Sequence, residues 1–226
     1  LRDELGQQVY RTDNLDELLA SARRETAEAR KELESAATLL TASRTSAFGT
    51  LTTEAVSLLR ELGIPDAKLL ISHKAVHAGP TGADQVEILF SANKGVDPRP
   101  LAAAASGGEF SRLMFVIKYV MAERTAMPTL ILDEIDSGVS GDIALKMGNL
   151  MRTIADRHQV IAITHLPQIA ARATGHFLVY KENESERTTS QVRKLKDAER
   201  ASEIARIISG NNPSPSALKY AKELLS

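Results

Sequence analysis

The chain has 226 residues, a formal net charge of −1 and no cysteine, which excludes a disulfide framework, a thiolate metal site and a thiol nucleophile. No apolar run approaches the roughly 18 residues of a membrane-spanning helix, so we expect no membrane partner. The near-neutral charge disfavours a dominant non-specific nucleic-acid surface. Because the first residue is Leu1, we expect the chain to be part of a longer protein.

Residues 1–62 are predicted to form one long helix, because they contain no Pro and only two glycines, Gly6 and Gly49. A coiled-coil arm whose partner helix precedes Leu1 is favoured over an amphipathic helix lying on a domain. The reason is a seam of small and apolar residues at alternating spacings of four and three; it comprises Leu15, Leu19, Ala22, Thr26, Ala29, Leu33, Ala36, Leu40, Ser43 and Ala47.

A β-hairpin is predicted directly after this helix. Gly63 can take the conformation that ends a helix, and Pro65 prevents its continuation. Two strand-like runs, Lys68–Val76 and Gln85–Ser91, flank the turn residues Gly79 to Gly82. A loop is expected to follow at residues 93–100.

From Ser106 onward the pattern predicts alternating helices and strands, and hence an α/β domain with a mostly parallel sheet covered on both faces by helices. We therefore expect residues 63–226 to form the second domain. The expected helices are 109–125, 143–155 and 167–173, and the expected strands are 129–132 and 160–164. The tail should add strands 175–181 and 188–195 around a polar turn at 182–187, then helices 198–208 and 214–225.

Two adjacent carboxylates, Asp133 and Glu134, end the first of these buried strands. Strand alternation sends them in different directions, so one can support Mg²⁺ while the other faces a water. Ligands of open α/β sheets bind at the carboxyl ends of strands, where these acids lie. The structural alternative is a strand that runs into an acidic helix cap.

A second motif, Ser106-Gly-Gly-Glu109, opens an apolar helix. Gly107 and Gly108 allow close approach of a ligand, and the free N–H groups of a helix start attract anions. A simple capped helix explains the same residues equally well. The third motif is an apolar strand that ends in His165, which can donate a hydrogen bond to a phosphate oxygen or serve only as a structural histidine.

The order of these motifs resembles the C-terminal lobe of the ABC ATPase superfamily. Three sequence segments contain these motifs: Ala105-Ser-Gly-Gly-Glu-Phe-Ser-Arg112, Leu132-Asp-Glu-Ile-Asp-Ser-Gly-Val-Ser-Gly141 and Ile163-Thr-His-Leu-Pro-Gln-Ile-Ala170. Their residues resemble those of the RecN family of SMC-like DNA repair proteins.

The resemblance implies an ATP sandwich between two heads of a homodimer, with ATP and Mg²⁺ as cofactors. Asp133 would support Mg²⁺, Glu134 would polarise the attacking water, and His165 would contact the γ-phosphate. The signature residues would bind ATP held by the opposite subunit; they are Ser106, Gly107, Gly108 and Glu109. The loop from Ser137 through Gly138 to Gly141 would cross the dimer interface.

The motif G-x-x-x-x-G-K-[S/T], which cradles nucleotide phosphates, does not occur in the sequence. The resemblance places it in an N-terminal lobe of the same protein, which is therefore an expected partner. We expect this chain alone neither to bind ATP tightly nor to hydrolyse it.

For the intact protein, the resemblance implies repair of double-strand breaks and recombination on double-stranded DNA and DNA ends, in the bacterial cytoplasm and at the nucleoid. Two alternatives are another SMC-like or ABC transporter nucleotide-binding lobe, and a non-enzymatic coiled-coil scaffold. Any DNA contact in this chain would involve Arg193, Lys194 and Lys196, although a solvated strand face explains them better.

Overall fold

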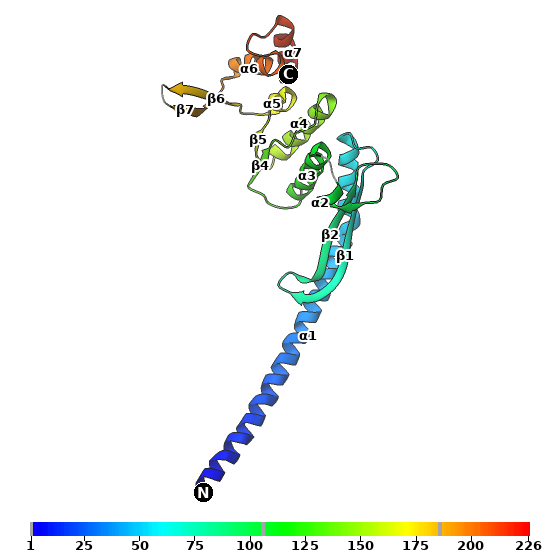
Figure 1. The fold of residues 1–226 in the computed structure, drawn as a ribbon, viewed down its shortest axis with the longest axis vertical. Coiled ribbons are helices and arrows are strands. Elements are labelled where there is room, and N and C mark those ends of the chain that lie inside the picture. Colours follow the sequence, from blue (N-terminus) through cyan, green and yellow to red (C-terminus); the bar gives the residue numbers. More distant parts are fainter. Residues whose placement is uncertain (1, 105–106, 185–186) are drawn as a thin grey trace. The chain divides into compact units, whose positions relative to one another are not determined.

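The computed structural model describes residues 2–104, 107–184 and 187–226 (Figure 1). The chain divides into two compact units. Unit 1 comprises the chain through Thr50 together with Ile71–Ile88, and unit 2 comprises Leu51–Leu70 and Leu89–Ser226. The division into an arm at residues 1–62 and a lobe at 63–226 stays a prediction. Among the described residues, no helix is both long and apolar enough to span a membrane.

Helix α1 (Arg2–Glu61) has the extent predicted from the sequence. It ends in a Schellman motif, in which the Gly63 N–H donates to the Arg60 carbonyl (3.1 Å) and the Ile64 N–H to the Leu59 carbonyl (2.9 Å). This geometry needs a left-handed residue after the helix, and Gly63 has φ +83°. In unit 1, all four leucines of the α1 seam are exposed, so their pairing in a coiled coil stays a prediction; they are Leu15, Leu19, Leu33 and Leu40.

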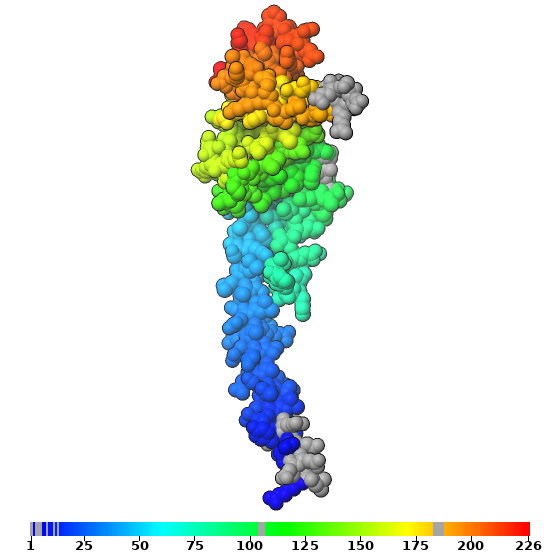
Figure 2. Space-filling model, turned by 90° about the vertical axis from the view of Figure 1, so that its left-hand side faces the viewer, coloured from blue at the N-terminus to red at the C-terminus, as the bar shows by residue number. Residues whose placement is uncertain are grey.

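The predicted hairpin is confirmed as strands β1 (Lys68–Gly79) and β2 (Gly82–Ser91), which are longer than expected. Within unit 1 the hairpin lies along α1 (Figures 1 and 2). Arg44 of α1 donates to the Thr81 carbonyl at the turn (2.7 Å), and Thr41 donates to the Asp84 carboxylate (2.7 Å). Polar contacts therefore fix the hairpin tip to the helix.

The prediction of a loop through residues 93–100 is wrong for its last two residues, which form a strand. Strand β3 (Arg99–Pro100) pairs antiparallel with β2, with Leu89 opposite Pro100 and Phe90 opposite Arg99. Pro100 has no N–H to donate to a neighbouring strand. It is tolerated here because β3 lies at the edge of the sheet. A short helix, α2 (Leu101–Ala104), follows and was not predicted.

The predicted α/β alternation is confirmed in unit 2. It consists of α3 (Gly107–Ala122), β4 (Thr129–Asp133), α4 (Gly141–Ala155), β5 (Gln159–Ile163) and α5 (Pro167–Arg172). Strands β4 and β5 are parallel, with Leu130 opposite Val160 and Asp133 opposite Ile163.

The core of unit 2 lies on one face of the β4–β5 sheet. Leu130 and Leu132 of β4 are buried, and helices α3 and α4 supply further buried residues, as does the end of α1. The fully buried large side chains of this core include Leu59, Leu62, Leu113, Phe115, Val116, Leu132, Met147 and Ile154. Burial of each such side chain contributes roughly 1.5–3 kcal/mol.

The opposite face of the sheet is exposed, which corrects the expectation of helices on both faces. Ile131 is 58% exposed, Ile161 45% and Ile163 53%. These three isoleucines, each about half exposed, form what we call the bare face. The apolar runs predicted burial on both sides because Ile is as apolar as the buried Leu residues beside it.

The tail contains strands β6 (Phe177–Glu184) and β7 (Arg187–Lys194), then helices α6 (Asp197–Ser209) and α7 (Pro215–Leu225). The expected turn at 182–187 is too wide, because antiparallel pairing continues to Glu184 opposite Arg187. Helices α5, α6 and α7 share a small apolar cluster, which contains Ala171, Ile204, Ala205, Ala217, Ala221 and Leu224.

Candidate functional site

Asp133 and His165 lie at the carboxyl ends of two neighbouring parallel strands. Asp133 ends β4, is exposed, and continues the side of the strand that carries Ile131. Its partner in the register is Ile163, so the segment that carries His165 starts beside it. His165 is exposed, two residues beyond the end of β5. The structure therefore brings the predicted acidic and histidine motifs to one edge of the sheet.

Glu134 has a left-handed backbone, with φ +46°. Among the described residues it is the one non-glycine residue with positive φ. Its N–H donates to the Ile163 carbonyl (3.2 Å), and its own carbonyl accepts from the Ser137 N–H (3.2 Å). The side chain is exposed. Such a backbone is strained for a residue with a Cβ, and retained strain of this kind is concentrated at functional sites.

The glycines of the second motif lie against the loop that follows Glu134. A Cβ built on Gly108 would be 3.3 Å from the Gly138 Cα and from the Ser137 carbonyl oxygen. Arg112 of α3 also reaches this loop, since its Nη1 lies 3.5 Å from the Gly138 carbonyl oxygen. Gly107 and Gly108 occupy the first turn of α3 with Glu109, while the predicted residue Ser106 lies outside the described residues.

The loop between β4 and α4 has two further left-handed residues, Gly138 (φ +70°) and Gly141 (φ +57°). Ser137 and Gly138 are both exposed. The Val139 N–H donates to the Asp136 carbonyl (3.1 Å), and the Val139 side chain is buried. The loop thus has a fixed turn whose exposed side presents Ser137 and Gly138.

Asp136 and Thr164 connect the two loops; both stand in the quoted motif segments, but no role was assigned to either from the sequence. Asp136 is 1% exposed and its Oδ2 accepts a hydrogen bond from the Thr164 hydroxyl. Thr164 Oγ1 in turn accepts from the Leu166 N–H (2.9 Å). The available signal was weak: a carboxyl and a hydroxyl, each close to a strand end.

A metal at this site would rely on few protein ligands. In the described part of the chain, no three His, Asp or Glu side chains are grouped so that they could hold a metal ion. Mg²⁺ usually keeps several waters and binds through one or two carboxylates together with substrate phosphates. The exposed carboxylate of Asp133 fits that mode of binding.

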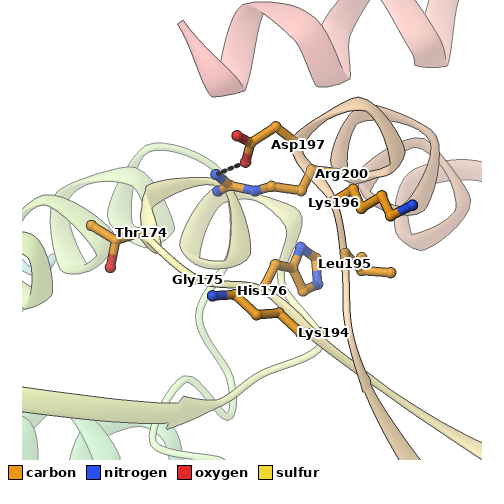
Figure 3. Close-up of a pocket in the computed structure, with 8 residues that line it drawn as sticks. All are labelled: Thr174, Gly175, His176, Lys194, Leu195, Lys196, Asp197 and Arg200. Carbon is orange, nitrogen blue, oxygen red and sulfur yellow. Dashed lines mark ion pairs between the residues drawn. The ribbon is translucent and has the colours of Figure 1, made fainter.

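A separate cavity of about 480 Å³ lies between the residues before β6, the end of β7 and the start of α6 (Figure 3). None of the residues predicted for the ATP site lines it, whereas Lys194 and Lys196, named above as possible DNA contacts, do. Arg200 donates to the carbonyls of Ala171 (3.3 Å) and Ala173 (2.6 Å), so it fixes the end of α5 to α6. Burial, and then the Arg200 charge, lower the pKa of His176. These contacts have a structural role.

Several DNA repair proteins named RecN are similar to this chain. The protein from Streptomyces coelicolor is 37% identical over 209 residues, which are 87% of this chain and 36% of the relative. The protein from Xylella fastidiosa is 36% identical over 227 residues, covering 99% and 41%, and that from Deinococcus radiodurans is 43% identical over 173 residues, covering 76% and 30%. The chain therefore spans about two fifths or less of the length of these relatives. No family model matches it.

Solved Smc head domains have a similar fold. The head from Pyrococcus furiosus, with an extended coiled coil and bound to the C-terminal domain of ScpA, gives a TM-score of 0.51 at 21% identity and covers 70% of this chain and 37% of that one. The head from Pyrococcus yayanosii, with a coiled coil and joint, gives 0.51 at 17% identity and covers 78% and 29%. The mixed α/β class and head-type fold are thereby confirmed.

Proposed function

This chain is homologous over nearly its whole length to a segment of the RecN DNA repair proteins, and we propose that it is the C-terminal half of a RecN-like ATPase head. In the intact protein it supplies the signature motif, the acidic strand end, the loop at 137–141 and His165 to an ATP site. The intact protein acts in double-strand-break repair and recombination.

The left-handed Glu134 is the observation that supports this function most directly. Its backbone turns the side chain out of the strand direction at the sheet edge, next to the segment that carries His165. A carboxylate held there can accept a proton from a water and orient it, which is the role phosphoryl transfer requires. His165 can donate a hydrogen bond to an anionic oxygen from the neighbouring strand end.

The remaining residues bind rather than react. Asp133 would hold Mg²⁺ through one carboxylate, and the metal, when bound with ATP, supplies charge neutralisation on the phosphates. The N-terminal turn of α3, with Ser106, Gly107, Gly108 and Glu109, would present N–H groups to a phosphate held by the second subunit. Ser137 and Gly138 would meet that subunit at the dimer interface.

The intact protein would need partners that the chain lacks. The bare face supports a lobe of the same protein that carries the phosphate-cradling motif and completes the sheet, because exposed apolar patches mark interfaces. The exposed seam of α1 supports a partner helix. Double-stranded DNA and its ends, a homodimer of heads, and a place in the bacterial cytoplasm at the nucleoid belong to the same proposal.

Glu134→Gln in the intact protein tests this function. The amide keeps the shape of the side chain but accepts protons poorly, so ATP binding should persist, turnover should fall by at least about 100-fold, and closed dimers should accumulate. Glu87→Gln, at an exposed position of β2, is the matched control and should retain wild-type turnover. Unchanged turnover in Glu134→Gln would refute the role of Glu134.

Calorimetric titration of the isolated chain with Mg-ATP tests whether the ATP site is divided between this chain and an N-terminal lobe. We expect no heat signal that corresponds to micromolar binding, because the residues that cradle the phosphates lie outside this sequence. Micromolar affinity would contradict that division. A scaffold without enzymatic activity instead predicts that neither Asp133→Ala nor His165→Ala changes any activity of the intact protein.

A further inference from the structure

Asp136 is a buried carboxylate that packing alone does not explain. The residue is 1% exposed, and its Oδ2 accepts one hydrogen bond, from Thr164. The other oxygen, Oδ1, is buried and has no hydrogen-bond partner among the described residues. Burial of a carboxylate with so few donors is unfavourable, and an apolar residue of similar volume would serve the fold at least as well. The side chain therefore has a use other than stabilising the core.

The Thr164 hydroxyl makes two hydrogen bonds, one to a residue that precedes it in the sequence and one to a residue that follows it. The hydroxyl donates to Asp136 in the loop after β4 and accepts from the Leu166 N–H in the loop after β5. The second bond closes a turn around His165, which lies between Thr164 and Leu166. The first bond ties that turn to the neighbouring loop.

A second tie joins the same two loops one step earlier. The Glu134 N–H donates to the Ile163 carbonyl (3.2 Å), which extends the pairing of β4 with β5 beyond the last strand residue. Glu134 thus makes the first tie itself and lies two residues before Asp136, which makes the second, while His165 directly follows Thr164. Only Ile135 separates the two tied residues of the loop after β4, and the turn between them begins at the left-handed Glu134.

We propose that Thr164 and Asp136 are positioning residues, whose hydrogen bond fixes His165 relative to Glu134. The inference rests on the proposed function, since it assigns these two residues to the same site. The hydroxyl sets the turn that presents His165, and the carboxylate sets the start of the loop at Ser137 that would meet the second subunit. A change in either loop is transmitted to the other through one side-chain contact.

Steady-state kinetics of the intact protein test the proposal. Thr164→Val keeps the shape of the side chain and removes the hydroxyl, so kcat should fall about 10- to 100-fold, as expected for a misplaced catalytic group. The KM for ATP should change less than about threefold, because the substitution shifts His165 without removing its side chain. Thr164→Ser, which restores the hydroxyl, should recover most of kcat. If the valine variant does not fold, Thr164→Ala is measured in its place.

A double-mutant cycle separates positioning from two independent defects. Thr164→Val combined with Asp136→Ala should turn over no more slowly than the slower single variant, because both remove the same bond. Asp136→Asn keeps an acceptor oxygen and should retain most of kcat. Multiplied losses in the double variant, or wild-type kcat in Thr164→Val, would overturn the proposal.

Amide hydrogen exchange on the isolated chain tests the contact without nucleotide. In Thr164→Val, exchange should accelerate at Leu166, which loses its acceptor, and at Val139, whose N–H donates to the Asp136 carbonyl (3.1 Å). The Gly210 N–H, bonded to the Arg206 carbonyl (2.8 Å), is the control and should not change. An unchanged rate at Val139 would overturn the coupling of the loops, whereas normal turnover in Glu134→Gln would refute only the proposed function.

Discussion

Replacement of Gly138 by alanine should destabilise unit 2 more than the same change at Gly141. Both residues are left-handed, with φ +70° and φ +57°, so alanine costs about 1–2 kcal/mol at each through its backbone alone. A Cβ at Gly138 would lie 3.0 Å from the Cα of Gly108, a backbone atom that cannot move aside alone. A Cβ at Gly141 meets no atom within 4 Å.

The difference between the two variants isolates this contact. Overpacking against backbone adds about 1–3 kcal/mol, which gives a total of about 2–5 kcal/mol for Gly138→Ala against about 1–2 kcal/mol for Gly141→Ala. Urea unfolding of the chain, followed by circular dichroism and tyrosine fluorescence, should place the Gly138→Ala midpoint roughly 0.5–1 M lower than that of Gly141→Ala. Equal midpoints would refute the reasoning that α3 and the loop are held in backbone contact.

Three further predictions concern unit 2. Leu132→Ala should lower the free energy of unfolding by about 2–5 kcal/mol, because the Leu132 side chain is 1% exposed. Ile131→Ala should lower it by about 1 kcal/mol or less, because the Ile131 side chain is 58% exposed. Similar losses for the two variants in urea titrations would contradict the assignment of the bare face. Gly108→Ala, whose Cβ would be 3.3 Å from Gly138, should unfold at lower urea than Gly107→Ala, whose Cβ meets nothing within 4 Å, and the reverse order would be evidence against the contact. The pKa of His176 is lowered by burial and by Arg200, so the folded state binds fewer protons than the unfolded state below about pH 6.5. Wild-type stability should therefore fall more steeply than that of His176→Gln as the pH drops from about 6.5 towards the lowered pKa. Parallel pH profiles of stability for the two proteins would argue against this linkage.

Local rules predicted the C-terminal end of α1 and the order of elements in unit 2. Gly63 supplies the left-handed residue of the Schellman motif, a requirement that can be read from the sequence alone. The parallel strands were predicted from apolar runs, but those runs do not reveal which face is covered, because Ile131 and Leu132 have similar hydrophobicity. The polar strand residues Glu182–Glu184 resembled a turn, since a ribbon exposed to solvent has no apolar alternation.

The sequence predicted the individual residues of the site but not the backbone conformation and hydrogen bond that connect them. Asp133 and His165 follow strand ends, and topology brings strand ends together, so their shared edge could be foreseen. The left-handed backbone of Glu134 could not, because a strained conformation depends on surrounding contacts that override local preference. The bond between Asp136 and Thr164 joins residues 28 positions apart, and no spacing rule links them.

The bare face also determines how the isolated chain behaves in solution. Within the part of the chain that the structure describes, each strand of the two-stranded β4–β5 sheet has a neighbour on one side only, so unpaired backbone groups border an apolar strip. Such an edge is a template for unwanted strand addition between molecules. Preparations of the chain alone should therefore self-associate as concentration rises, and an Ile161→Lys variant should keep them monodisperse in light scattering. Three isoleucines on one side of a small sheet are thus expected to govern how the chain is handled.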